Sequence, residues 1–348
     1  MAWSLIYRVA NPGPSLGLIM HEIPVLGEED EGFVLVRLLA SPINRVDLMV
    51  LTDQYPIKPR YVADGEPVPG FDGCGVIVES NHPELEPGDV VIPRELGLGT
   101  WRTHAILPAK SLLKLPRDTP PLAASLLRSS ALVAWLLLEE VMLLREGDWV
   151  IASAGTSCVA QFLTQLACRK GVHAILIIRD RECAPETKAE LLGLGAAKVL
   201  TESELERYGS EAIQENIVLA IDSVFGSVGQ SLIETLAPGG KYVLLGMLGG
   251  SSGSLTVNTK HLFHRRLSFL PFRSSDVLNR IGTANAEALF HKVARLLTDG
   301  SLKCPSVRFV KWAQGNDNQG TLEKIVRESL QNAESKDVGY KKLVWDFQ

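Results

Sequence analysis

One stretch near the middle of the chain combines strand, turn and helix signals in an order that few folds use. An apolar run at residues 149–152 is followed by a turn of small residues, 153–157, and by a segment with helical spacing, 159–170. A second apolar run lies at 174–178. This order predicts the first crossover of a dinucleotide-binding sheet. The turn needs small residues because backbone N–H groups must approach a pyrophosphate at the positive end of the helix.

The turn keeps only part of the glycine pattern that such sites usually carry. Gly155 and Ala160 satisfy the pattern, whereas Ser157 stands where glycine is expected. The end of the second strand adds a signal, because Arg179 and Arg181 follow it. A guanidinium pairs bidentately with phosphate oxygens, so the two arginines suit the 2′-phosphate of NADPH. A solvated charged turn is the alternative that the residues alone leave open.

The length and composition of the chain narrow the class of protein. Its 348 residues predict two domains, since single cores stop growing at about 250–300 residues. A hydrophobic content of 46% is typical of globular proteins, and a net charge of −5 argues against a nucleic-acid partner. Five scattered cysteines indicate reduced thiols. No apolar run approaches the ~20 residues of a membrane span, and no leader is visible, so we expect a cytoplasmic protein without a membrane partner.

The distribution of turns and apolar runs predicts how the domains follow one another. Residues 1–121 hold short apolar runs separated by proline and glycine, which indicates a β-barrel-like module. Residues 122–272 alternate strands with helices, which indicates a parallel sheet covered on both faces. Residues 273–348 return to complete the first module. We expect an edge strand at 267–272 and a homodimer formed through it, because unpaired strand edges invite pairing.

Several short motifs occur together over nearly the whole length. The most specific is Gly-Leu-Gly-Thr-Trp-Arg-Thr at 97–103, while Pro-Ile-Asn at 42–44 precedes Asp47 and Tyr55, and Arg-Asp-Arg stands at 179–181. With these motifs the chain resembles the medium-chain dehydrogenase/reductase superfamily and, within it, the mitochondrial 2-enoyl thioester reductase family. The resemblance implies an α/β fold with a Rossmann-type doubly wound parallel sheet and a GroES-like β-barrel catalytic domain.

The resemblance also implies an activity. A member of this family is an oxidoreductase that uses NADPH, without zinc, to reduce the α,β double bond of an enoyl-CoA or enoyl-acyl-carrier-protein thioester by hydride transfer to the β-carbon. Tyr55 falls on the catalytic position, as proton donor or carbonyl polariser, because a tyrosine hydroxyl can donate a hydrogen bond. The alternative is that Tyr55 lies at a domain edge with its hydroxyl exposed to water, as tyrosines often do. The resemblance further implies an acyl carrier protein as a partner, and it gives a mitochondrial location as the alternative to a cytoplasmic one.

The cofactor and pocket positions that the resemblance implies form a larger set. The pyrophosphate turn and the 2′-phosphate site comprise Gly155, Thr156, Ser157, Cys158, Val159, Arg179, Asp180 and Arg181. Further cofactor contacts are assigned to Ser130, Leu245, Gly246, Met247, Leu248, Phe272 and Lys341. Asn44 and Trp101 are assigned to the substrate pocket, although a turn asparagine and a core tryptophan are the more usual roles of these residue types.

Three departures from the family pattern leave other functions open. Cys158 replaces a family glycine, Ser130 replaces a family asparagine near the nicotinamide, and Pro271-Phe272-Arg273 lacks the family's aromatic pair. An NADPH-dependent ene or quinone reductase, or a biosynthetic tailoring enoyl reductase acting on another substrate, is therefore the first alternative. A binding protein that keeps the Rossmann fold without catalysis is the second.

We expect no metal in this protein. Phe71 and Asp72 stand where zinc-dependent members of the superfamily carry a His-Glu pair, and Cys74 stands alone. A catalytic zinc needs three protein ligands, and this chain lacks their spacing. Negative charge that develops on the substrate must then be met by a hydrogen-bond donor or by a delivered proton, and Tyr55 can serve in either way.

Overall fold

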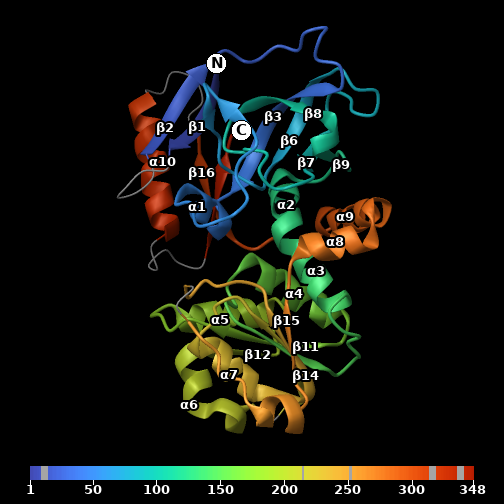
Figure 1. Ribbon diagram of the computed structural model, residues 1–348, viewed down its shortest axis with the longest axis vertical. Coiled ribbons are helices and arrows are strands. Elements are labelled where there is room, and N and C mark those ends of the chain that lie inside the picture. Colours follow the sequence, from blue (N-terminus) through green and yellow to red (C-terminus); the bar gives the residue numbers. More distant parts are fainter. Residues whose placement is uncertain (9–14, 214, 251–252, 313–318, 335–340) are drawn as a thin grey trace. The chain divides into compact units, whose positions relative to one another are not determined.

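The chain forms two compact units (Figure 1). The computed structural model describes residues 1–8, 15–213, 215–250, 253–312, 319–334 and 341–348. Unit 1 comprises Met1–Ser129 and Glu287–Gln348, and unit 2 comprises Ser130–Ala286. The expected boundaries, after residues 121 and 272, lie earlier in the chain. They differ because α2 (Pro121–Leu126) packs on strands of unit 1, whereas α8 (Ser274–Ile281) packs on α3 (Leu132–Glu139) in unit 2.

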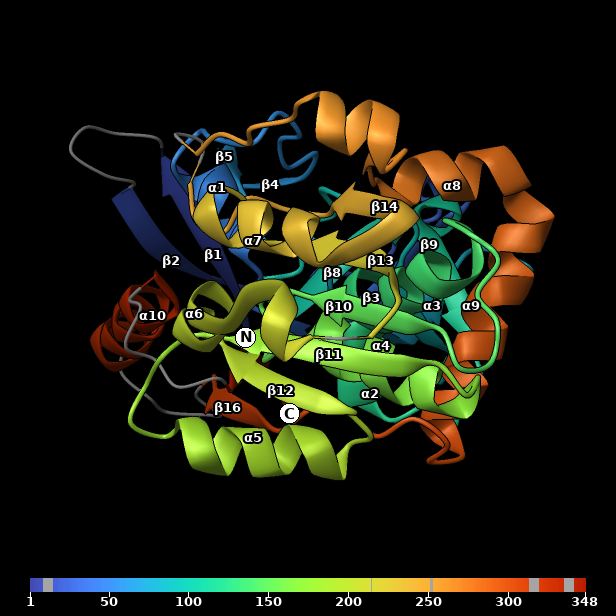
Figure 2. The same ribbon diagram turned by 90° about the horizontal axis from the view of Figure 1, so that it is seen from below.

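Unit 2 is built on a six-stranded sheet in which every pair of neighbours is parallel. Its strands lie side by side in the order β12 (Lys198–Thr201), β11 (His173–Ile178), β10 (Trp149–Ala152), β13 (Ile217–Asp222), β14 (Leu236–Leu244) and β15 (Ser268–Pro271) (Figure 2). The direction in which the chain adds strands reverses between β10 and β13, so their carboxyl ends flank the switch point of a doubly wound sheet. The predicted Rossmann-type sheet is confirmed.

The sequence of unit 2 explains why this sheet is buried on both faces. Consecutive residues of β11, Ile175, Leu176 and Ile177, are each 0% exposed, so side chains on both faces are covered. The helices that pack on the sheet are α4 (Cys158–Arg169), α5 (Ala184–Gly193), α6 (Glu202–Ala212) and α7 (Ser227–Thr235). The β-branched and leucine side chains of the strands therefore form a core that fixes the strand ends.

Unit 1 is built mainly on an antiparallel sheet that uses both ends of the chain. Its path is β16 (Val307–Lys311), β17 (Lys342–Asp346), β3 (Phe33–Pro42), β6 (Cys74–Ser80), β7 (Val90–Pro93) and β9 (Leu112–Leu115), and β8 (His104–Pro108) also pairs with β3. Only β16 and β17 pair in parallel among the described strands of this sheet. The late strand β17 thus lies between an equally late strand and an early one.

Shorter elements surround this sheet. Two hairpin pairs, β1 (Ala2–Arg8) with β2 (Ser15–His21) and β4 (Val62–Ala63) with β5 (Glu66–Pro67), are antiparallel. A 3-10 turn, η1, spans Ala109–Ser111. Helix α10 (Gln319–Glu334) packs on α1 (Arg45–Leu51) and on β2, and α9 (Thr283–Thr298) precedes β16. The helix α1 begins directly after β3 and leads towards the loop that carries Tyr55.

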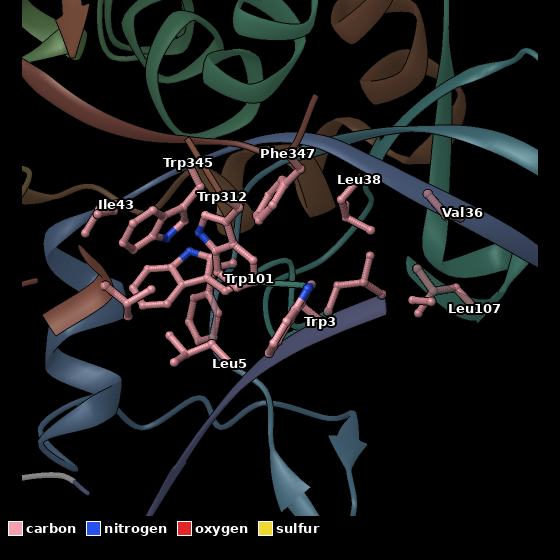
Figure 3. Close-up of a cluster of buried hydrophobic side chains, with 14 of the residues drawn as sticks. Trp3, Leu5, Val36, Leu38, Ile43, Trp101, Leu107, Trp312, Trp345 and Phe347 are labelled. Carbon is pink, nitrogen blue, oxygen red and sulfur yellow. The ribbon is translucent and has the colours of Figure 1, made fainter. Parts of the chain in front are cut away.

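The core of unit 1 contains three tryptophans, of which Trp345 packs against the other two (Figure 3). The ring of Trp345 lies 5.7 Å from that of Trp101 and 5.9 Å from that of Trp312, both in edge-on geometry. Their indole N–H groups have no hydrogen-bond partner among the described residues. Edge-on packing lets such N–H groups point at neighbouring π faces, which is a weak but real interaction. Trp101 is 0% exposed, so its place is that of a core tryptophan, the alternative role named for it.

One helical stretch is longer and more apolar than the sequence suggested. α2, a π-helical turn at Leu127–Ala131 and α3 run continuously from Pro121 to Glu139, and these 19 residues have the length and hydropathy of a possible membrane span. This corrects the expectation that no apolar run approaches that length. In its most apolar window of 18 residues, 72% is buried inside the protein. Burial of this extent is typical of a core helix.

Candidate functional site

The turn after β10 is held by close packing and by its own hydrogen bonds. The Gly155 N–H donates to the Ile177 carbonyl at 2.7 Å, and a Cβ on Gly155 would lie 2.8 Å from the Cβ of Leu176. Only glycine therefore fits without displacing β11. Ser157 caps α4 by accepting the Ala160 N–H at 3.2 Å. The amino end of α4 thus lies at the carboxyl end of β10, the place where sheets of this kind bind a pyrophosphate.

The remaining residues of the predicted pyrophosphate turn are packed to different degrees. The Thr156 carbonyl accepts a hydrogen bond from Gln161 Nε2 at 2.8 Å, which ties the turn to the first helical turn of α4. Val159 is half-buried. Cys158 is 5% exposed, so its side chain fills a small space inside the fold where the family pattern has glycine. The turn is compact in spite of its two missing glycines.

The predicted 2′-phosphate residues follow β11 at the same edge of the sheet. Arg179 is exposed and Arg181 is half-buried. The Asp180 carboxylate between them is engaged by Ser203, accepting its N–H at 3.0 Å and its hydroxyl. The acidic side chain that would accept ribose hydroxyls in an NAD site is therefore occupied by a protein donor. Glycine turn, helix end and arginine pair together fit a dinucleotide with a phosphorylated ribose.

A buried carboxylate at the end of β13 joins three strand ends. Asp222 is 0% exposed; its Oδ1 accepts the Ser153 hydroxyl at 2.7 Å and the Val224 N–H at 2.8 Å, and its Oδ2 accepts the Tyr242 hydroxyl at 2.5 Å. Burial and the neighbouring carboxylate raise the pKa of Tyr242, so the phenol remains a donor. These hydrogen bonds connect the carboxyl ends of β10 and β13 to β14 at the switch point.

Sequence reasoning missed this cluster, although one signal was present. The run Ile217–Asp222 is apolar up to its final residue, and a carboxylate that ends a buried parallel strand lies at the functional edge of such a sheet. The partners Ser153 and Tyr242 are 69 and 20 residues away in the chain. No local pattern links them, so only the strand order brings them together.

The segment after β14, predicted to line the nicotinamide side, is anchored on β13. The N–H groups of Leu245 and Gly246 both donate to the Asp222 carbonyl, at 2.7 and 3.2 Å. Met247 and Leu248 remain on the surface, 51% and 36% exposed. The structure therefore places these four residues at the carboxyl edge of the sheet, with two apolar side chains exposed there.

Two other predicted cofactor residues belong to unit 2 and are buried. Phe272, which follows β15, is 8% exposed, and its N–H donates to the Leu244 carbonyl at 2.9 Å. Ser130 is 5% exposed in the π-helical turn Leu127–Ala131. Both side chains belong to the packing of their elements, and a cofactor contact for either stays a prediction.

Unit 1 holds a chain of charged and amide groups, which we call the Asp72 network: Arg128, Asp72, Asn44 and Lys342. Arg128 pairs with Asp72 Oδ1 at 3.2 Å, Asn44 Nδ2 donates to Asp72 Oδ2 at 2.8 Å, and Lys342 Nζ donates to Asn44 Oδ1 at 2.9 Å. Asp72 is 1% exposed. A buried carboxylate needs a charge partner and hydrogen bonds, and Asp72 has both. The predicted pocket residue Asn44 is the centre of this network.

A second buried carboxylate lies beside the Asp72 network. Asp47 is 0% exposed and accepts the Asn44 N–H at 2.7 Å and the Phe71 N–H at 3.0 Å. Burial raises the pKa of Asp47 to about 7. The negative charge of Asp72 adds to the rise, while the two N–H donors and Lys342 oppose it. Asp47 therefore holds the backbone of Phe71 in place from the first turn of α1.

Tyr55 lies in the loop after α1 and is half-buried. Its ring centroid lies 5.9 Å from that of Phe71, and the two planes are tilted by 59°. Phe71 is 0% exposed, so it forms a fixed wall for the Tyr55 ring. Asn44, Asp47 and Tyr55 therefore lie in one corner of unit 1, and Asp47 supports the Tyr55 ring through Phe71.

The predicted site lysine, Lys341, is exposed, and its neighbour is the one that joins the network. Lys342 Nζ donates to the Ile43 carbonyl at 3.2 Å as well as to Asn44. Successive residues at a strand point to opposite faces, so a difference of one position decides which lysine faces Asn44. For Lys341 a cofactor contact stays a prediction, and Lys342 is an addition that sequence reasoning missed.

The described residues include no group of three or more His, Cys, Asp or Glu side chains that could hold a metal ion. The Cys74 thiol donates to the Pro121 carbonyl at 3.1 Å. Burial raises the pKa of Cys74 to about 12. A thiol of this kind is protonated at neutral pH, and the thiolate is the metal-binding form.

Comparison with known proteins gives a consistent family. Residues 30–117 match the alcohol dehydrogenase GroES-like domain. The chain is similar to the mitochondrial enoyl-acyl-carrier-protein reductase of Mus musculus, with 33% identity over 276 residues, which are 78% of this chain and 72% of the relative. It is 36% identical to the Homo sapiens protein of the same name over 218 residues, or 61% and 57% of the two chains.

Solved structures give the same fold. A mitochondrial 2-enoyl thioester reductase heterodimer from Candida tropicalis matches with a TM-score of 0.85 and 23% identity over 99% of both chains. A putative NADPH:quinone reductase from Bacillus thuringiensis matches with a TM-score of 0.77 and 22% identity over the full length of both. The GroES-like domain and the Rossmann-type sheet that the sequence predicts are therefore both confirmed as parts of the fold.

Proposed function

Because this chain belongs to the mitochondrial enoyl-acyl-carrier-protein reductase family of the medium-chain dehydrogenase/reductases, we propose that it reduces enoyl thioesters with NADPH and without zinc. The observation that carries the proposal is the arginine pair Arg179 and Arg181 at the carboxyl edge of a Rossmann-type sheet, in a chain 33% identical to an enoyl reductase. A related structure was solved with NADP and crotonyl-CoA, which supports both the cofactor and the thioester.

The residues of unit 2 suit the cofactor in separate ways. The turn at Gly155 and the amino end of α4 would hold the pyrophosphate, and Arg179 with Arg181 would hold the 2′-phosphate. The Asp222 cluster fixes the carboxyl end of β10, from which the pyrophosphate turn begins, against β13 and β14. Bound NADPH supplies the hydride that reduces the β-carbon of the enoyl thioester.

The residues of unit 1 supply the groups that respond to charge on the substrate. Hydride addition at the β-carbon leaves an enolate, which needs a donor at its oxygen or a proton at its α-carbon. We assign that role to the Tyr55 phenol, which is held against Phe71. The Asp72 network positions this corner by tying α1 to β17 through Asn44 and Lys342.

Zinc independence forms part of the proposal and is supported by the chemistry of unit 1. The Asp72 carboxylate is already engaged by Arg128 and Asn44. Phe71, which stands before it, has no ligating atom in its side chain. An assay in the presence of a zinc chelator should leave the activity unchanged, and a full loss of activity that added zinc restores would contradict this part.

The direct test follows loss of nicotinamide absorbance with NADPH and a short enoyl-CoA. Arg179→Ala combined with Arg181→Ala should weaken the binding of NADPH far more than that of NADH, because only NADPH carries the 2′-phosphate. Arg145→Ala combined with Arg169→Ala is the matched control, since it removes two exposed arginines near the opposite, amino edge of the sheet. Equal effects of the two double variants would contradict the assignment.

Two outcomes would favour the alternatives. Turnover of free enones or quinones but not of thioesters would select an ene or quinone reductase, or a tailoring enzyme with another substrate. Failure to bind NADPH at millimolar concentration would select a binding protein without catalysis.

Acyl carrier protein and a mitochondrial location complete the proposal. The relatives are named as mitochondrial and as acting on acyl-carrier-protein substrates, and this favours the mitochondrial alternative over the cytoplasmic expectation. Fractionation of cells that express the full-length protein tests the location. A comparison of kcat/KM for enoyl-CoA and enoyl-acyl-carrier-protein substrates tests the carrier.

A further inference from the structure

The arginine pair has an acidic neighbour on the next strand. β11 and β12 are parallel with Ile178 opposite Thr201, so residues 179–181 and the first residues of α6 leave the sheet side by side at the same edge (Figure 2). The contact is fixed by Ser203, which donates its N–H to Asp180 at 3.0 Å and its hydroxyl to the same carboxylate. Glu202 therefore starts α6 directly beside the two arginines.

The Glu202 carboxylate lies within electrostatic reach of both guanidinium groups. It is half-buried and makes no hydrogen bond or ion pair with another residue in the described parts of the chain. Burial raises the pKa of Glu202, the positive charges of Arg179 and Arg181 oppose that rise, and Asp180 adds to it. Glu204, two residues on, differs because it pairs with Lys188 at 2.7 Å and bonds the Thr201 N–H.

We propose that Glu202 is a specificity-determining residue that limits the preference of this site for NADPH over NADH; the inference rests on the proposed function, in which Arg179 and Arg181 hold the 2′-phosphate. A phosphate that approaches the two arginines also approaches Glu202. The phosphate carries about −1.5 to −2 charges, and like charges repel at this range. Glu202 thus weakens the phosphate contact, whereas the neutral 2′-hydroxyl of NADH meets no such penalty.

The consequence separates this site from one with a bare arginine pair. The arginines select for the phosphate, and Glu202 reduces the size of that selection without abolishing it. Removal of the Glu202 charge should therefore act on NADPH and leave NADH almost unchanged. A residue that merely supported the fold would move both cofactors together.

Calorimetric titration of the full-length protein with NADPH and with NADH at one salt concentration tests the inference. Glu202→Gln should tighten the binding of NADPH about threefold to tenfold and change the affinity for NADH by less than about twofold. Glu206→Gln is the matched control, because it removes the same charge from an exposed position one turn further along α6. Glu202→Ala should reproduce the effect of Glu202→Gln, and thermal unfolding checks that each variant is folded.

The possible results distinguish a failure of the proposed function from a failure of this inference. If the wild-type protein binds no NADPH, the proposed function fails and this inference fails with it. If the wild-type protein binds NADPH but the Glu202 variants bind it no more tightly, only the inference fails. Equal tightening by Glu206→Gln, or equal tightening of NADH by Glu202→Gln, would also overturn it.

Discussion

Tyr55 is the residue whose assignment is easiest to test alone, because its ring is held by Phe71 and its hydroxyl is the only group that the phenylalanine variant lacks. Tyr55→Phe should lower kcat for enoyl thioester reduction on the order of 10²–10⁴, the range of general acid catalysis. The KM for NADPH should hardly change. The rate is measured from nicotinamide absorbance at saturating cofactor.

Tyr61→Phe is the control for that variant. Tyr61 also packs partly buried against the core of unit 1, and Arg102 lies over its ring at 5.7 Å, yet it has no assigned chemical role. A wild-type rate in Tyr55→Phe, or the same loss in both variants, would remove Tyr55 from the mechanism.

Asp47 predicts a pH dependence of stability. Its pKa in the folded chain is about 7, above the ordinary value of 3.8, so the folded state binds the proton more tightly than the unfolded state. The free energy of unfolding should therefore fall as the pH rises from 3.8 to about 7 and then level off. Urea unfolding at pH 5 and pH 8 measures this fall.

Two variants separate Asp47 from the other titrating groups. Asp47→Asn should lower the free energy of unfolding by about 1–3 kcal/mol at pH 5, because an amide cannot accept both the Asn44 and the Phe71 N–H groups. Between pH 5 and pH 8 the stability of this variant should fall less than that of the wild-type protein. Asp118→Asn, at an exposed position, should keep the wild-type difference. An unchanged difference in Asp47→Asn would contradict the raised pKa.

At the scale of single residues the sequence predicted part of the site. Gly155, Arg179 and Arg181 follow from the local pattern of a strand, a turn and a second strand. The Asp72 network does not, because Asn44, Asp72, Arg128 and Lys342 lie up to 298 residues apart and no spacing rule connects them. The sequence also does not show that Lys342 rather than Lys341 faces Asn44, because this depends on the orientation of β17.

The turn between β10 and α4 is the element on which cofactor binding depends. Gly155→Ala would place a Cβ 2.8 Å from the Leu176 Cβ and 3.1 Å from the Ile177 carbonyl oxygen. We expect a loss of about 1–3 kcal/mol in stability, as for other overpacked positions, together with weaker NADPH binding. Thermal unfolding and calorimetric titration measure the two effects.

Gly193→Ala provides the comparison within the same unit. A Cβ at this last residue of α5 would meet nothing within 4 Å, and alanine favours helix over glycine by roughly 1 kcal/mol. The variant should be as stable as the wild type or more stable, with NADPH binding intact. A Gly155→Ala protein that behaves like Gly193→Ala would show that the turn tolerates a side chain.

Elements with a strong apolar pattern were predicted well, and those without one were not. The expected strands at 149–152 and 174–178 correspond to β10 and β11, and the expected helix at 159–170 to α4, within one residue at each end. Helix α6 was missed because its sequence, Glu-Ser-Glu-Leu-Glu-Arg-Tyr-Gly-Ser-Glu-Ala, has few apolar residues. Its start is set instead by the cap at Thr201 and Glu204, a short signal that is easily overlooked.

For the whole molecule we predict a homodimer through the edge strand. β15 pairs only with β14 among the described strands, so its other side offers unpaired backbone groups, and Leu270 in it is 37% exposed. Sedimentation at micromolar concentration should give the mass of a dimer. Leu270→Arg should shift it towards the monomer, because a charge at an edge strand opposes pairing.

Leu192→Arg is the control for the dimer, since Leu192 is 48% exposed on α5 and lies away from the edge strand in the sheet order. It should leave the mass unchanged. A wild-type monomer, or an unchanged dimer in Leu270→Arg, would contradict the predicted interface.

The position of β17 bears on how a cell makes this protein. β3 (residues 33–42) pairs with β17 (Lys342–Asp346), which is synthesised hundreds of residues later. Unit 2 is synthesised entirely within that interval and can fold first. Until then the end of β3 at Ala40–Pro42 lacks its partner strand, although β8 can already pair with Phe33–Arg37. We expect nascent unit 1 to depend on chaperones during that delay. A premature stop codon that removes only this last strand would take Trp345 from the core and leave a finished nucleotide-type sheet attached to an unfinished partner.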